Sequence, residues 1–103
     1  MSGPTIQTAQ HAADNLERAL AVNQAAETAR DKAQADLRSA HDDVERGRVS
    51  GDYQAFNRAL AALPLAKQAL ERAVGTVQAT AAGLSSAANA NGHALHLARQ
   101  SAK

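Results

Sequence analysis

The chain has 103 residues, of which 27 are alanine, one is tyrosine, one is phenylalanine and none is cysteine or tryptophan. The absence of cysteine excludes disulfides, thiol catalysis and thiolate metal sites, and a net charge of +1 provides no global attraction to nucleic acid or to a membrane surface. Because alanine favours helices but contributes little apolar area, the composition predicts thin, closely packed helices that depend on association between chains for stability.

The first predicted element is a long helix over residues 5–46. Thr5 can cap it, and no glycine or proline interrupts it. Asn23 is the one polar residue on its apolar face, which comprises Ile6, Ala9, Ala13, Leu16, Leu20, Ala26, Ala29, Ala33, Leu37, Ala40 and Val44. At ~1.5 Å per residue this helix would span ~63 Å, which predicts an elongated molecule.

Residues 47–51 form the predicted turn, and they lie near the middle of the chain. Gly47 is expected in the left-handed conformation that follows a helix end, with Gly51 as the second turn glycine. Ser50 or Asp52 can cap the helix that follows. A turn at this place is typical of an antiparallel helical hairpin.

The second predicted helical arm covers residues 52–90. The second half of the chain, which comprises this arm and the residues after it, follows a heptad pattern of alternating steps of three and four. Lys67 interrupts the apolar inward positions, which are Tyr53, Phe56, Leu60, Leu63, Leu70, Val74, Val77, Ala81, Leu84, Ala88, Asn91, Leu95 and Ala98. Pro64 predicts either a kink in this helix or a break between a short helix over 52–63 and a new helix.

The end of the chain differs from the rest in charge. No Asp, Glu, Lys or Arg occurs over residues 73–98, so more of the circumference of this segment is expected to be covered than in an ordinary surface helix. With the turn centred near residue 49, residue i would lie opposite residue 98 − i. The sequence over 89–92, which ends in Gly92, then predicts that residues 93–103 form a separate short helical segment.

Few residues suggest site chemistry. Arg46, Arg48 and Arg58 surround the turn and are the candidate contacts for a partner, although nearby carboxylates cancel most of their field. His93 and His96 have the spacing of a helical ligand pair but no third ligand is evident. No phosphate-binding loop or nucleophile elbow is present. The sequence therefore predicts a protein that is not an enzyme and uses no metal, cofactor or small-molecule substrate.

The sequence as a whole predicts an all-α, elongated antiparallel helical hairpin that self-associates into an oligomeric helical bundle. The predicted seam and oligomer residues are Leu16, Leu20, Leu37, Val44, Tyr53, Phe56, Leu60, Leu63, Leu70, Val74, Val77 and Leu84. The leading functional hypothesis is structural or assembly work in a larger protein complex, such as a phage particle or a secretion machine. The alternative is a small soluble adaptor or inhibitor that covers a surface of another protein.

The length and the mid-chain turn resemble the small helical hairpins exported by type VII secretion, which implies a third alternative, a secreted hairpin. That family carries Trp-x-Gly in the turn and a tyrosine-to-acid signal in the tail. Here the turn reads Gly47-Arg48-Val49-Ser50-Gly51, and the tail has neither Tyr nor an acid. Without a signal peptide or a membrane-spanning segment, the default expectation is a cytoplasmic protein, with a virion or leaderless secretion as the other possibilities.

Overall fold

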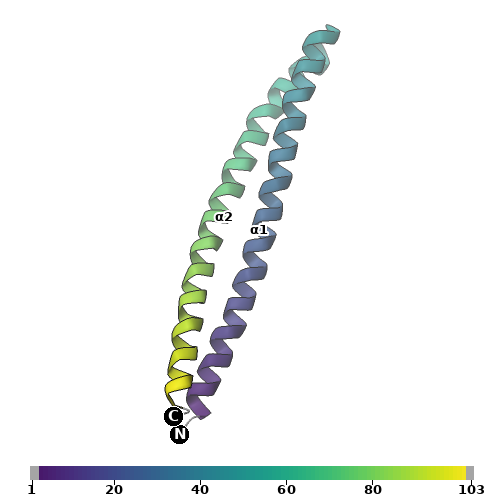
Figure 1. Cartoon of the computed structure of the whole chain (residues 1–103). Coiled ribbons are helices and arrows are strands. Elements are labelled where there is room, and N and C mark those ends of the chain that lie inside the picture. Colours follow the sequence, from purple (N-terminus) through teal and green to yellow (C-terminus); the bar gives the residue numbers. More distant parts are fainter. Residues whose placement is uncertain (1–2, 102–103) are drawn as a thin grey trace. The chain divides into compact units, whose positions relative to one another are not determined.

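The computed structural model describes the backbone of residues 3–101 and the side chains of residues 7–100. Two long helices, α1 (Gly3–Ser50) and α2 (Tyr53–Ser101), account for all of this backbone except Gly51 and Asp52 (Figure 1). The described residues contain no strand, so the predicted all-α hairpin of two long helices is confirmed. Alanine-rich segments form these helices because alanine has the highest helix propensity.

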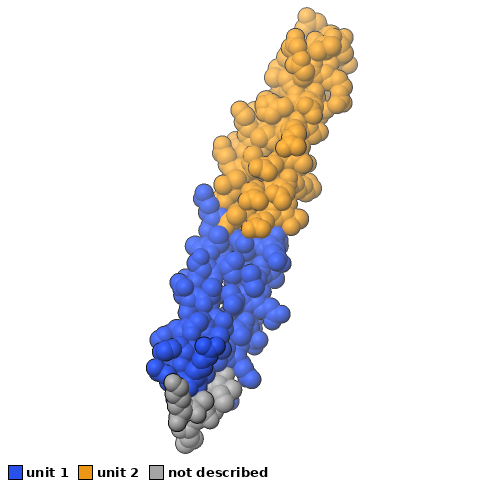
Figure 2. Space-filling model, viewed as in Figure 1, with its two compact units in different colours: residues 1–25, 78–103 blue, residues 26–77 orange. Residues whose placement is uncertain are grey.

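The chain divides into two compact units, each of which pairs a segment of α1 with a segment of α2 (Figure 2). Unit 2 covers residues 26–77 and contains the turn, so its two helical segments form a hairpin. Unit 1 combines residues 3–25 with residues 78–101 of the described backbone, and there the start of α1 runs antiparallel to the end of α2.

The turn is shorter than predicted and lies further along the chain. α1 continues to Ser50 rather than ending at residue 46, and Gly51 is the residue with positive φ, at 74°. The expectation of a left-handed Gly47 is therefore wrong. Asp52 caps α2, because the backbone N–H of Ala55 donates to its Oδ1 at 3.1 Å, a role that the sequence predicted for this residue or Ser50.

α2 continues through both of the predicted interruptions. Pro64 lies inside the helix, so the alternative with a separate helix over 52–63 is wrong. The helix also passes through Gly92 and ends at Ser101, so residues 93–101 belong to α2 rather than to a separate segment. Pro64 removes one backbone donor, and Gly92 costs about 1 kcal/mol relative to alanine, but tertiary packing routinely outweighs such local preferences.

We use the term seam for the positions of each helix that face the other helix. Along α1 the least exposed residues recur in strict steps of three and four: Ala9, Ala12, Leu16, Ala19, Asn23, Ala26, Arg30, Ala33, Leu37, Ala40, Val44 and Gly47. Three predicted members, Ala13, Leu20 and Ala29, are exposed instead, and Ile6 lies outside the described side chains. The predicted phase was therefore right for part of the face and one residue off elsewhere.

The seam of α2 shows the same displacement. Its members are Phe56, Ala59, Leu63, Ala66, Leu70, Ala73, Val77, Thr80, Leu84, Ala87, Asn91, Ala94 and Ala98. The predicted residues at every seventh position from Phe56 are half-buried members of this seam. The predicted residues at every seventh position from Leu60, which include Lys67 and Leu95, are exposed, apart from the half-buried Val74. At each of these levels the residue one position earlier, such as Ala59 or Ala94, faces α1 instead. Tyr53 is also exposed, with 80% of its surface accessible.

Two close contacts define the register of the helix pair, one in each unit. In unit 1 the hydroxyl of Thr80 donates to Asn23 Oδ1 at 2.9 Å. In unit 2 a Cβ added to Gly47 would lie 2.8 Å from Phe56 Cα. In both pairs the residue numbers add up to 103, not to the predicted 98, because α1 extends further than expected.

This register places a small residue opposite a larger one at most levels of the seam. Extended through each unit, it pairs Leu16 with Ala87, Ala19 with Leu84, Ala33 with Leu70, Leu37 with Ala66, Ala40 with Leu63 and Val44 with Ala59. A small residue opposite a larger one lets the two side chains fill one layer while the backbones stay close.

Candidate interaction surfaces

The core of the helix pair is thin. The buried hydrophobic residues are six alanines, and among the described residues no side chain reaches full burial. Larger apolar groups are partly or mostly exposed, including Leu65 at 65% and Val22 at 55%. Since alanine contributes little apolar area, the seam provides modest hydrophobic stabilisation for so long a pair of helices.

The exposed surface of the chain is large for its mass. Its accessible area is 7321 Å², whereas a compact monomer of 10.7 kDa exposes about 5,500 Å². The excess of about 1,800 Å² is more than twice the roughly 800 Å² that each partner buries in a standard protein interface. The chain therefore has enough uncovered surface for a further helix to pack against it.

The predicted seam and oligomer residues separate into two groups. Half-buried in the seam, or beside it, are Leu16, Leu37, Val44, Phe56, Leu63, Leu70, Val74, Val77 and Leu84. Leu20, Leu60 and Tyr53 are exposed. Exposure leaves these three available to contact another chain rather than to hold the two helices together.

Asn23 is the buried polar residue of the seam, and Thr80 is its partner across the helix pair. Asn23 is 8% exposed, and its Oδ1 accepts the 2.9 Å hydrogen bond from the Thr80 hydroxyl. The sequence indicated Asn23 as a seam residue but did not indicate Thr80. A buried polar pair favours one register, because sliding either helix would leave both groups without this hydrogen bond.

Charged residues are concentrated in unit 2. Of the 21 Asp, Glu, Lys and Arg residues in the sequence, 16 lie within residues 26–77, with eight of each sign. In unit 1 the described side chains include only four: Asp14, Glu17, Arg18 and Arg99. Unit 2 therefore has the charged outer surface of an ordinary solvated helix pair, and unit 1 does not.

Unit 1 contains an open groove of about 510 Å³ between α1 and α2. Its sides include Thr8, His11 and Asn15 from α1, and Ser86, Ala90 and His93 from α2. Ala12 and Ala94, which are buried, and Ala87 also contribute to its lining. We call this feature the unit 1 groove; none of the residues that line it carries a formal charge with histidine neutral.

The three arginines predicted to contact a partner lie near the turn in unit 2. Arg46 and Arg58 line one shallow groove of about 480 Å³, whereas Arg48 lines a smaller one of about 200 Å³, and Gly47 contributes to both. Arg46 pairs with Asp43 at 3.6 Å, and Arg48 pairs with Glu45. Carboxylates of the same helix thus neutralise two of the three arginines.

The Glu45–Arg48 ion pair shifts the pKa of both of its members. Arg48 Nε donates to Glu45 Oε2 at 3.1 Å, and a second contact joins Arg48 Nη2 to Oε1. These hydrogen bonds lower the pKa of the Glu45 carboxyl and raise the pKa of Arg48. Both side chains face solvent, so the pair stabilises the helix only weakly.

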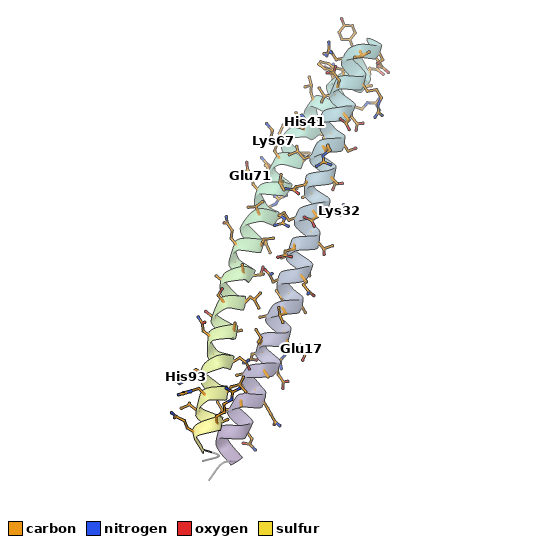
Figure 3. All side chains as sticks on the ribbon, in the orientation of Figure 1. Glu17, Lys32, His41, Lys67, Glu71 and His93 are labelled. Carbon is orange, nitrogen blue, oxygen red and sulfur yellow. The ribbon has the colours of Figure 1, made fainter. Side chains whose placement is uncertain are left out.

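The four histidines are distributed over both units. Within the described part of the chain, no group of three or more His, Cys, Asp or Glu side chains is arranged to hold a metal ion. His96 lies 3.1 Å from the amide of Gln100, one turn later, whereas His93, labelled in Figure 3, lines the unit 1 groove with His11. His93 and His96 are thus engaged in different environments.

Comparison with known proteins adds no relative from which function can be transferred: no protein-family description, curated protein or solved structure matches the chain. Neither helix, over the residues described, is long and apolar enough to cross a membrane. Function must therefore be inferred from the surfaces of the two units.

Proposed function

We propose that the chain is a non-enzymatic structural or assembly protein that associates with copies of itself within a larger protein complex. Two observations taken together support this proposal. The buried hydrophobic residues of the seam are alanines, and the accessible surface is about 1,800 Å² larger than that of a compact monomer of equal mass. Association removes apolar surface from water, which compensates for the thin core.

The distribution of side chains supports the same proposal. Val22 and Leu97, both in unit 1, expose 55% and 40% of their surface, and few charges surround them. An apolar side chain gains about 25 cal/mol for each Å² of apolar area that a partner covers. An open groove lined largely by small side chains, such as the unit 1 groove, suits the packing of another helix better than the enclosure of a substrate.

The test is the mass of the protein in solution. Sedimentation-velocity runs over a concentration series from low to high micromolar should give at least twice the 10.7 kDa mass of one chain. Helix content and melting temperature should rise with concentration, because association stabilises the folded state by mass action. A monomer that stays fully helical and melts at a temperature independent of concentration would refute the proposal.

The adaptor hypothesis has one observation in its favour, at the turn. Val49 and Tyr53 expose 71% and 80% of their surface beside Arg48, and tyrosine and arginine are enriched at the energetic centres of protein interfaces. A monomer that binds a single different protein through this end of unit 2 would favour the adaptor. Tyr53→Ala would then abolish binding to that protein, whereas it should leave self-association unchanged.

A further inference from the structure

We propose that two copies of the chain pack through the unit 1 groove, with the α2 segment of each copy seated against the groove of the other. This inference rests on the proposed self-association and specifies its surface. The occupant is a second copy of this chain, related by a two-fold axis, so that the two unit 1 regions together form a four-helix arrangement.

Gly83 lies on the face of α2 that borders the groove, because it precedes Ser86 by three residues and Ala90 by seven. A Cβ added at Gly83 would meet nothing within 4 Å, so packing inside a single chain does not require glycine there. Glycine in an exposed helix is less favourable than alanine, whereas a close approach by another backbone does require it. A facing helix of another copy would explain a glycine on this face, and Gly92, which has the same open space on the opposite side of α2, serves as the control.

The charge of the groove also suits a second copy. In a two-fold interface the same patch faces itself, so a charge close to the axis meets a like charge. The residues that line the unit 1 groove contain no Asp, Glu, Lys or Arg, and Arg18 and Arg99 are the only arginine or lysine residues among the described side chains of the whole unit. An uncharged patch is self-compatible, whereas the surface of unit 2 presents charges of both signs.

The size and shape of the groove match the side chains that a second copy would supply. A groove of about 510 Å³ with alanine on its floor admits apolar side chains from a facing helix. Leu97, which is 40% exposed at the edge of the groove, is such a side chain, and its symmetric copy supplies the second one. The excess of about 1,800 Å² belongs to the whole chain, of which unit 1 is about half, and a stable dimer needs roughly 800 Å² per partner.

The experiment compares two alanine substitutions by sedimentation equilibrium. Gly83 and Gly92 are nine residues apart, which is two and a half helical turns, so they project from opposite sides of α2. Both have open space where a Cβ would lie, so either change to alanine should raise the helix stability of a single chain. Gly83→Ala should weaken dimerisation about tenfold or more by crowding the facing helix, whereas Gly92→Ala should leave it unchanged or strengthen it.

A second matched pair tests the same face with charge. Ala90→Glu and Ala81→Glu place the same good helix former on opposite sides of α2, again nine residues apart at exposed positions. Ala90→Glu should abolish the dimer at concentrations where Ala81→Glu retains it. Far-UV circular dichroism at high concentration shows whether each variant still forms its helices.

The outcomes separate the two proposals. A wild-type chain that is monomeric at all concentrations would overturn both. A wild-type oligomer that resists Gly83→Ala and Ala90→Glu, or that is disrupted instead by Gly92→Ala and Ala81→Glu, would overturn the groove interface and leave self-association standing.

Discussion

The two helices come close together at Gly47, and Gly47→Ala is a sharp test of the seam. A Cβ at this position would lie 2.8 Å from Phe56 Cα and 3.0 Å from Phe56 N, which are backbone atoms that cannot rotate away. Helix propensity alone would favour alanine by about 1 kcal/mol. Overpacking against backbone typically costs about 1–3 kcal/mol, so we expect a net loss of about 0–2 kcal/mol.

The control for this substitution is Gly75→Ala, at another helical glycine of unit 2. A Cβ there would meet nothing within 4 Å, so the same change should stabilise the chain by about 1 kcal/mol. For a chain of this size, 1 kcal/mol corresponds to a shift in melting temperature of about 4–8 °C. Thermal melts followed by circular dichroism at one fixed protein concentration should therefore move in opposite directions. If Gly47→Ala melts as high as Gly75→Ala, the close approach of the backbones is wrong.

Three further predictions concern the seam and the surface. Thr80→Val should lower the free energy of unfolding by about 1 kcal/mol in the wild-type chain and by less in an Asn23→Ala background. Denaturant titrations of the double-mutant cycle measure both values, and equal losses would mean that the two groups are not coupled. In the same titrations, Leu70→Ala should lower the free energy of unfolding by about 2 kcal/mol. Leu65→Ala changes a mostly exposed residue and should lower it by well under half of that amount, so the reverse order would contradict the observed register. The pKa of Glu45, measured by NMR, should lie below the ordinary glutamate value and return to it in Arg48→Ala. The small stabilisation that this pair provides should be present above the ordinary glutamate pKa and be lost as the pH falls through the lowered pKa.

Much of the fold follows from local sequence. Long stretches of alanine and other good helix formers specify two helices, and the glycines and serine around residue 50 place the reversal of the chain near the middle. Asp52 is recognisable as a cap, because a carboxylate that precedes a helical run accepts hydrogen bonds from free backbone N–H groups. Each of these features depends on residues within a few positions of each other.

The seam is harder to predict from the sequence, because large apolar side chains are the usual guide to which positions are buried. Leu60 and Leu95 were expected to face α1, and Ala59 and Ala94 do so instead. A signal was nevertheless present in the sequence, since alanine recurs every seven residues from Ala12 to Ala40 and is followed by Gly47. In a closely packed helix pair, the most buried positions belong to the smallest residues, because they let the backbones approach.

Helix content, the hairpin and the absence of Asp, Glu, Lys and Arg over residues 73–98 can all be read from the order of the residues alone. Three other features required the packed structure: Gly47 stays helical, α2 runs through Pro64 and Gly92, and Thr80 faces Asn23. The physical reason is that these outcomes depend on the register between residues far apart in the chain. Contacts distributed along the seam outweigh a local cost of about 1 kcal/mol at a glycine and about 3 kcal/mol at a proline. These contacts join residues that are far apart in the chain, so the sequence near the glycine or the proline does not predict them.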